Sequence, residues 1–213
     1  MILPNLVNWF KPDKKRKSYS RARYYEEQLK EKLDSDFYRN LFDLQEQSKT
    51  QTTTTEFDFR LGIGFGMTVS EVMKKWGKPH EKVEIKTPFE SSGLFYRLKV
   101  FGINMKCEMH FIQDKLYVLQ FKFDYLSEEQ YKEVYEMLNI KYVPENSEKL
   151  KHHSVVKTPL ESSLIIEDGI NLKLNYISGD LASKTLLTDD MDRKELQKRN
   201  YRTKRHLELM SCF

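Results

Sequence analysis

Hydrophobic residues recur every three or four positions between Ser20 and Gln47, a spacing that is typical of α-helices. The apolar positions are Tyr25, Leu29, Leu33, Phe37, Tyr38, Leu41 and Phe42. Ser35 stands where it would cap a second helix, so the pattern predicts two helices or one kinked helix. Residues 48–56 are polar and rich in β-branched threonine. We interpret them as a linker, with an extended edge segment as the alternative.

A short helix is predicted at residues 68–76. Thr68 and Glu71 have the spacing of a capping box, and Gly77 with Pro79 ends the helix. The apolar residues of this segment form one stripe, which consists of Val69, Val72, Met73 and Trp76. Because all of these signals agree, we expect a helix of about two to three turns that packs through its tryptophan.

Alternation of apolar and polar residues follows at 96–100, 103–111 and 117–123. A period of two indicates strands that bury one face. The connection QDK at 113–115 has the length of a hairpin turn. We therefore predict an antiparallel meander, half buried.

The same order of elements then returns. Ser127 and Gln130 form a second capping box, and 164–177 has the pattern of two strands around an EDG turn. KTPFESS at 86–92 recurs as KTPLESS at 157–163, and GINMKCEMH at 102–110 recurs as GINLKLNYI at 169–177. We interpret this as duplication of a helix-plus-meander unit, because a single copy would leave two open sheet edges. Chance recurrence of a common turn sequence is the alternative.

Together these patterns predict an α+β fold. Two tandem helix-plus-antiparallel-meander repeats form a sheet packed on short helices, with an N-terminal helical arm and a C-terminal helix. Residues 1–55 are the arm and linker, and residues 56–180 are the duplicated domain, with repeats at about 59–125 and 126–178. Residues 181–213 form a basic C-terminal helical tail.

A short helix opened by GMTVSEV and closed by WGKP, followed by an antiparallel sheet, resembles the motif of the small outer-membrane-assembly lipoproteins called SmpA or BamE. The matching residues are Gly66, Met67, Thr68, Val72, Gly77 and Pro79. Two such units in tandem resemble the beta-lactamase-inhibitor-protein-like fold. The resemblance implies a domain that binds other proteins across an exposed sheet face. A signal sequence and a lipidated cysteine precede the motif in that family and are lacking here, so its outer-membrane role is not carried over.

Basic residues are concentrated at two places in the chain. The 213 residues are 39% hydrophobic, 13% aromatic and 32% charged, with a net charge of +4. Residues 14–25 hold six basic residues and no acidic one, and residues 193–206 hold seven basic residues and one acidic one. The remainder has a net charge of −8, because each basic cluster contributes +6. An aromatic content of 13% is atypical of a disordered chain, so we expect a folded protein. The charge distribution indicates an acidic centre with basic ends.

The first residues place an apolar segment before a basic one, which is the opposite of the order in a secretory signal. The apolar positions are Ile2, Leu3, Leu6, Val7, Trp9 and Phe10. Since no run of about 18 apolar residues occurs, we predict no helix that spans a bilayer. We expect a cytoplasmic protein whose apolar start docks on its own core or on a partner. An interfacial membrane anchor and a disordered end are the alternatives.

The sequence lacks a strong signature of catalysis. Cys107 and Cys212 lie far apart, so we predict neither a disulfide nor a zinc site. GIGFG at 62–66 matches neither a Walker motif nor a dinucleotide fingerprint, and we interpret it as a strand-to-helix turn. His152 and His153 make at best a weak metal site. We predict no enzyme, no cofactor and no metal; a hydrolase whose acids and histidines converge only in three dimensions stays open.

Two functional hypotheses remain. The first is a non-enzymatic protein-binding module, for instance an inhibitor or immunity protein, that acts through an exposed sheet face. The candidate partner-binding residues are Arg97, Lys99, Lys106, Glu108 and His110. The alternative is a nucleic-acid-binding or ribosome-associated protein whose basic ends bind phosphates. The candidate phosphate-binding residues are Lys14, Lys15, Arg16, Lys17, Arg199, Arg202, Lys204 and Arg205.

Overall fold

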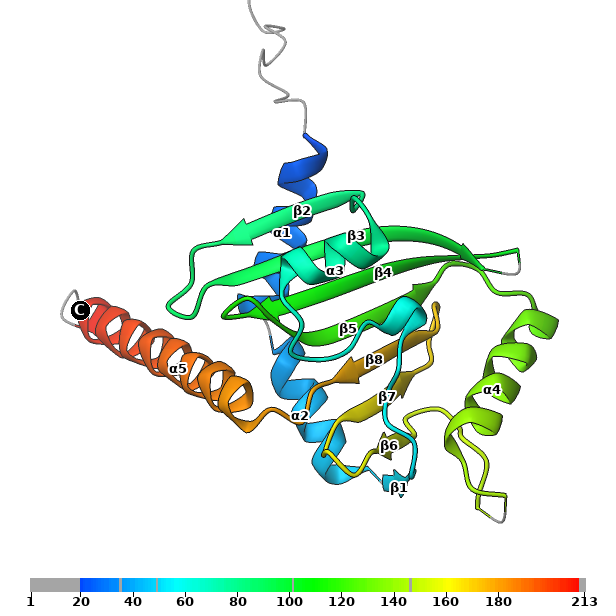
Figure 1. The fold of residues 1–213 in the computed structure, drawn as a ribbon. Helices are drawn as coiled ribbons and strands as arrows, with labels where there is room; N and C mark the ends of the chain where they lie inside the picture. Colours follow the sequence, from blue (N-terminus) through cyan, green and yellow to red (C-terminus); the bar gives the residue numbers. More distant parts are fainter. Residues whose placement is uncertain (1–19, 35, 49, 101, 146, 211–213) are drawn as a thin grey trace, which may run out of the picture.

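One eight-stranded sheet forms the centre of the molecule in a computed structural model (Figure 1). The structure describes residues 20–34, 36–48, 50–100, 102–145 and 147–210. The strand order is β1-β6-β7-β8-β5-β4-β3-β2, and every pair is antiparallel except β1 with β6. The strands are β1 (Thr50–Thr52), β2 (Glu81–Ile85), β3 (Ser91–Val100), β4 (Ile103–Ile112), β5 (Lys115–Phe123), β6 (Val155–Lys157), β7 (Ser163–Glu167) and β8 (Lys173–Ile177).

Helices cover both faces of this sheet (Figure 1). We call the face under α1 and α2 the back face, and the face that carries α3 and α4 the front face. The helices are α1 (Arg21–Asp34), α2 (Phe37–Gln47), α3 (Val69–Trp76), α4 (Glu128–Tyr142) and α5 (Leu181–Met210), with a 3-10 turn η1 (Arg60–Gly62). The predicted α+β class, the paired N-terminal helices and the C-terminal helix are confirmed.

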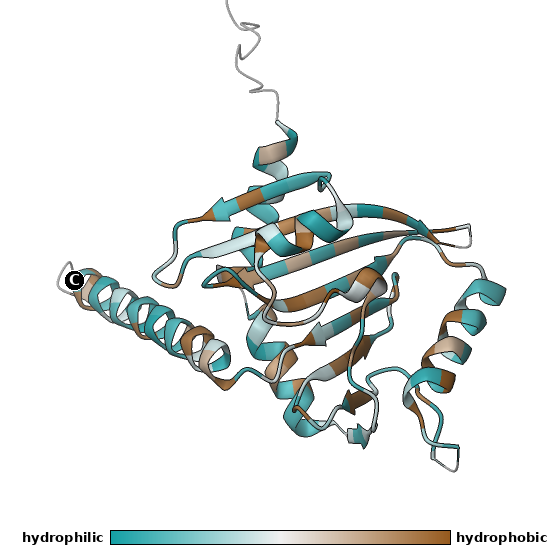
Figure 2. Cartoon of the chain, viewed as in Figure 1, coloured by the Kyte–Doolittle hydropathy of each residue, from teal (hydrophilic) through white to brown (hydrophobic). Residues whose placement is uncertain are grey.

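The central strands are buried from both sides. Met109 and Leu119 belong to the front core, whereas Tyr117 and Val118 belong to the back core, and none of the four is more than 1% exposed. The sequence predicted a meander with one face open to solvent, and for these strands that prediction is wrong because α1 and α2 cover the back face. Figure 2 shows the resulting pattern, in which the central strands carry hydrophobic residues and the outer length of α5 is largely hydrophilic.

Both predicted capping boxes are present. Thr68 Oγ1 accepts a hydrogen bond from Glu71 N at 3.2 Å, and the Glu71 carboxylate accepts one from Thr68 N at 2.8 Å. Ser127 and Gln130 make the same reciprocal pair at the start of α4. Each box satisfies backbone N–H groups that the first helical turn leaves unpaired. Ser35 lies outside the described residues, and Asp36 takes the cap position of α2.

The GIGFG and QDK segments form the predicted turns. Gly66 has a φ of 79°, and its N–H donates to the Leu116 carbonyl at 3.0 Å, which fixes the approach to α3 against the sheet. In the QDK hairpin, Gln113 and Asp114 have φ values of 50° and 57°. Two consecutive positive φ values are those of the tight turn that matches the twist of a hairpin. The segment interpreted as a linker contains the edge strand β1, which was the alternative.

The repeated phrase KTPxESS folds into the same turn twice. Glu90 N donates to Thr87 O at 3.3 Å, and Glu161 N donates to Thr158 O at 3.0 Å. Both glutamates are left-handed, with φ values of 47° for Glu90 and 60° for Glu161. The first copy joins β2 to β3 and the second joins β6 to β7. The two copies therefore share their local backbone structure.

The surroundings of these two turns are nevertheless not related by symmetry. A half-turn about β5 would superpose β4 on β8 and keep the strand directions, but it would exchange the two faces of the sheet. Cys107 of β4 and the equivalent Leu174 of β8 both lie in the front core, together with residues from α3 and α4. Phe89 is 3% exposed, whereas its counterpart Leu160 is 70% exposed. The two copies therefore occupy different surroundings, and the duplication inferred from the repeated phrases stays a prediction.

Candidate functional site

The predicted partner-binding residues do not lie together on one open face. Arg97 and Lys99 are exposed on β3, and Lys106 on β4 is half-buried and pairs with Asp124 at 2.7 Å. Glu108 and His110 are 8% and 1% exposed. Their predicted exposure is wrong, because α1 and α2 lie over the part of the back face that carries them.

Glu108 and His110 belong to a buried polar network between the sheet and these helices. Lys32 on α1 donates to the Glu108 carboxylate and, at 2.9 Å, to Gln120 Oε1. Tyr38 on α2 shares a hydrogen bond of 2.7 Å with His110 Nδ1. His110 Nε2 lies 3.7 Å from Glu108, beyond hydrogen-bond distance. The network therefore ties both N-terminal helices to β4 and β5.

The network continues across β5, β8 and β7. Gln120 Nε2 donates to Asn175 Oδ1, and Asn175 Nδ2 donates to Glu167 Oε1 at 2.6 Å. Lys173 then pairs with Glu167 at 3.2 Å. The polar side chains of this network alternate with the apolar residues of the strands. A period of two therefore predicts, wrongly, that they face solvent. The bonds between these buried groups offset the cost of removing them from water.

Electrostatics keep the central pair of this network in fixed charge states at neutral pH. Burial alone would raise the pKa of Glu108, but the neighbouring His110 and the Lys32 ammonium outweigh it and lower that pKa to about 2. Burial lowers the pKa of His110, and Lys32 adds to this effect. Glu108 is therefore a carboxylate and His110 a neutral imidazole. With almost no exposed surface, both serve the packing of the helices and are poor candidates for contact with a substrate.

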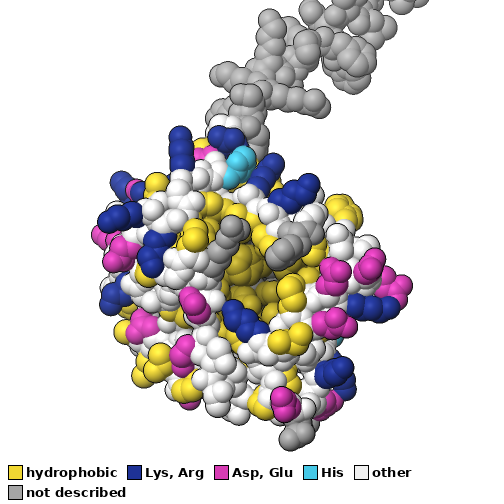
Figure 3. Space-filling model, turned by 45° about the vertical axis from the view of Figure 1, so that its right-hand side comes forward, with side chains coloured by type: hydrophobic (Ala, Val, Ile, Leu, Met, Phe, Trp, Pro, Cys, Tyr) yellow, Lys and Arg dark blue, Asp and Glu magenta, His cyan; other side chains and the backbone are white. Residues whose placement is uncertain are grey.

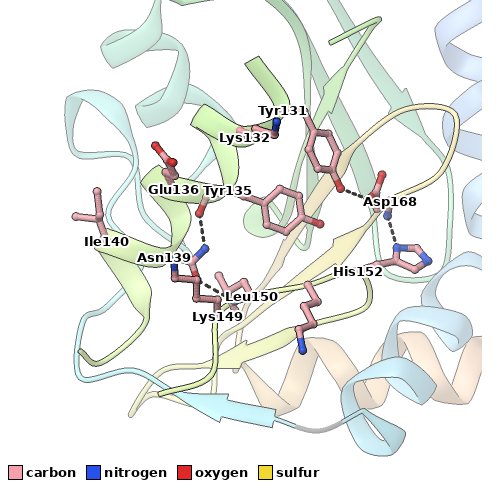
Figure 4. A pocket seen from close by; sticks show the side chains of 11 residues that line it. Tyr131, Lys132, Tyr135, Glu136, Asn139, Ile140, Lys149, Leu150, His152 and Asp168 are labelled. Carbon is pink, nitrogen blue, oxygen red and sulfur yellow. Dashed lines mark hydrogen bonds between the residues drawn. The ribbon is translucent and has the colours of Figure 1, made fainter. Parts of the chain in front are cut away.

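A cavity of about 730 Å³ lies beside α4, where Tyr131 and Tyr135 face Asp168 and His152 (Figure 4). The Tyr131 hydroxyl donates to the Asp168 carboxylate, and the Asp168 N–H donates to His152 Nδ1 at 3.0 Å. Burial raises the pKa of both tyrosines, so their hydroxyls stay protonated at neutral pH. These groups can donate hydrogen bonds to a bound molecule, but neutral phenols lack the reactivity of an activated nucleophile.

The described residues contain no group of three His, Cys, Asp or Glu side chains that would hold a metal ion. His152 and His153 have ring centres 3.5 Å apart, but His152 Nδ1 is already engaged by the Asp168 N–H. Cys107 is buried in the front core, and Cys212 lies outside the described residues. Burial raises the pKa of the Cys107 thiol, so it stays protonated.

An apolar groove runs along the other side of α4, between this helix and the ends of β3, β4 and β5. We call it the front groove; its volume is about 500 Å³, and it is lined by Val100, Ile103, Met105, Phe123, Glu133, Val134, Glu136, Met137 and Ile140. Figure 3 shows the front face as a hollow with hydrophobic side chains across its floor. Ile140 is 86% exposed and Met137 is 52% exposed, so α4 presents apolar residues to solvent as well as to the core.

The sequence of α4 contains a signal for this groove that the prediction did not use. Val134 and Leu138 of α4 are buried and form an apolar stripe along one face of the helix. Met137 and Ile140 fall outside that stripe, and two large apolar residues on the outer face of a helix indicate a second contact surface. The groove was not predictable, because it depends on how α4 lies against the ends of β3, β4 and β5.

Only part of the predicted phosphate-binding set lies in the described chain. Its members there, Arg199, Arg202, Lys204 and Arg205, are exposed on α5. The other members, Lys14, Lys15, Arg16 and Lys17, lie outside the described residues, as do the apolar positions of residues 2–10. None of the described helices is long and apolar enough to cross a membrane.

Comparison of the chain with known proteins found no match. No family model matches it, and neither the curated proteins nor the solved structures contain a match. The resemblance to the SmpA or BamE motif therefore stays a prediction.

Proposed function

We propose that this chain is a non-enzymatic protein-binding module whose binding site is the front groove. The observation that carries the proposal is the exposure of Met137 and Ile140 beside an apolar hollow. The proposed binding surface lies on the front face, and not around Arg97, Lys99 and the other strand residues selected from the sequence.

Covering these side chains is energetically favourable. Burying an isoleucine or methionine side chain completely contributes about 1.5–3 kcal/mol. Ile140 is 86% exposed, so nearly all of this gain is available to a partner. Val134 and Ile103 below are already packed, which gives the groove a firm floor and keeps the cost of ordering it on binding low.

The rim of the groove indicates the chemistry of the partner. Glu133 and Glu136 border the apolar floor, and Glu128 and Glu129 lie one turn earlier on the same helix. An amphipathic helix with apolar anchors flanked by Lys or Arg would satisfy both features, because its apolar face enters the groove and its basic residues meet the acidic rim. An inhibitor or immunity role is compatible with such a site, but fold analogy is its only support.

The proposal is tested by selecting peptides from a random displayed library on the immobilised chain. Enriched peptides should combine apolar anchors with Lys or Arg. They should bind the double variant Met137→Glu/Ile140→Glu at least about tenfold more weakly, which corresponds to about 1.4 kcal/mol. The matched control is Leu160→Glu/Leu207→Glu, which replaces two exposed apolar residues outside the groove. The proposal fails if no enriched peptide distinguishes the groove variant from this control.

A further inference from the structure

The outer half of α5 projects away from the sheet (Figure 1). Its first half packs on the back core through Leu187, with Ser183 and Asp190 also buried. Residues 196–210 are exposed along their whole length. The basic cluster at 193–206 begins near the last buried residue of the helix, Asp190, and continues into its exposed part. Most of its seven cations therefore face solvent.

A cleft of about 470 Å³ lies where α5 passes the start of α2. Five cationic side chains line it, against two acids, Asp36 and Glu195. The cations are Arg39, Lys194, Lys198, Arg199 and Arg202. Arg39 of α2 lies about 155–163 residues before the α5 cations in the chain, so no local pattern in the sequence indicates that they meet. We call this site the basic cleft.

Ion pairs hold some of these cations in place. Arg39 lies 3.1 Å from Asp192 and 3.4 Å from Glu195, and Arg199 lies 2.5 Å from Glu195. Lys194 pairs with Asp190 at 3.0 Å, where α5 meets the core. In the described part of the chain, Lys198 and Arg202 have no such acidic partner. The cleft therefore contains three cations that are held in ion pairs and, among the described residues, two cations without an acidic partner.

We propose that the basic cleft and the adjoining face of α5 bind the phosphodiester backbone of a nucleic acid. Lys198, Arg202 and Arg205 are spaced four and three residues apart, so they lie along one face of the helix. The rise from Lys198 to Arg202 is about 6 Å, which lets them meet different phosphates of one strand. Tyr201, 67% exposed beside Arg202, offers a ring on which a base can stack.

A membrane surface fits this helix less well than a nucleic acid. An interfacial helix needs a continuous face of large apolar residues opposite its basic face. Leu196, Leu207 and Met210 are exposed on the face of α5 opposite Lys198 and Arg202, but the polar residues Asn200 and Thr203 lie between them and interrupt that face. The basic cleft is lined by residues of α2 and α5, whereas the front groove lies beside α4, so the two sites share no lining residue.

Fluorescence anisotropy with labelled 20-mers, as single-stranded RNA, single-stranded DNA and duplex DNA, tests this proposal. We expect at least one oligonucleotide to bind, with an affinity that falls steeply between 50 and 200 mM salt. The charge reversal Lys198→Glu/Arg202→Glu should weaken binding at least tenfold. It should also reduce the slope of log K against log salt by roughly 1.5, because two phosphate contacts are lost.

The matched control is Lys74→Glu/Lys149→Glu, which changes the net charge equally at exposed positions away from α5. Both variants should keep the far-ultraviolet circular dichroism of the unmodified chain, since all four side chains are exposed. The proposal is overturned if no oligonucleotide binds at 50 mM salt, or if the two variants bind alike. It is also overturned if phosphatidylserine vesicles, and not oligonucleotides, show the dependence on α5.

Discussion

His110 is the residue whose protonation most directly links pH to this fold. It is buried against Tyr38, Lys32 and Glu108, and its pKa is lowered, chiefly by burial. In the unfolded chain it takes up a proton near pH 6.5. The folded state binds this proton only at a lower pH than the unfolded state does. The contribution of His110 to the free energy of unfolding is therefore fully present above pH 6.5 and is lost as the pH falls towards the lowered pKa of the folded state.

We therefore expect the free energy of unfolding to decrease between pH 7.5 and 5.5 by up to about 1.4 kcal/mol per pH unit for one proton. His110→Gln should flatten that slope, because glutamine can keep a bond to Tyr38 but does not titrate. Urea unfolding at several pH values measures the slope. His206→Gln is the control, because His206 is exposed on α5. An unchanged slope in the His110 variant would show that other groups carry the pH dependence.

Residue-level properties were predictable only where they depend on neighbours in sequence. The capping box of Thr68 and Glu71 was predictable because both partners lie within one helical turn. Glu108 and His110 alternate with apolar residues in the way that surface residues do. Their burial depends on Lys32 and Tyr38, which lie 76 and 72 residues away, respectively, and no local pattern encodes that contact.

At the scale of elements, the repeated phrase is best explained as a repeated turn. Glu90 and Glu161 hold the left-handed position that follows Thr-Pro-Phe and Thr-Pro-Leu. A β-branched residue is strained there by roughly 1–2 kcal/mol. The two hairpins should therefore respond to substitution in the same way even though Phe89 is buried and Leu160 is exposed.

We expect Glu90→Val and Glu161→Val each to lower the free energy of unfolding by about 1–2 kcal/mol in urea titrations. Glu84→Val is the control, because Glu84 lies in strand β2, where valine is favoured. Glycine at positions 90 and 161 should be tolerated, since it adopts positive φ without strain. Equal effects of valine at positions 84, 90 and 161 would show that the left-handed turns do not restrict the sequence.

The order of the elements followed from the sequence, but their arrangement in the sheet did not. Capping boxes, alternation and turn residues are local signals, and they located α3, α4 and the hairpins correctly. The pairing of β5 with β8 instead joins segments about 55 residues apart, as Gln120 and Asn175 illustrate. That pairing sets the direction in which the second meander extends, and no local signal in the sequence encodes it.

For the whole molecule, the structure separates two surfaces of different chemistry. The back face is covered by α1, α2 and the start of α5. The basic cleft lies between α2 and α5. The front face leaves a hollow between its helices, where α4 adds an acidic, apolar rim. The sequence could show an acidic centre and basic ends, but only the fold shows that these charges border a groove and a cleft on opposite sides of one sheet.

The central claim is that a partner binds in the front groove, and methyl nuclear magnetic resonance tests it most directly. A chain labelled at Ile and Val methyl groups is titrated with a peptide selected as above. We expect the signals of Ile103, Val134 and Ile140 to shift with saturation. Those of Val118 and Ile165, in the back core, should stay in place. Shifts confined to the back core or to α5, with Ile140 unchanged, would contradict the account.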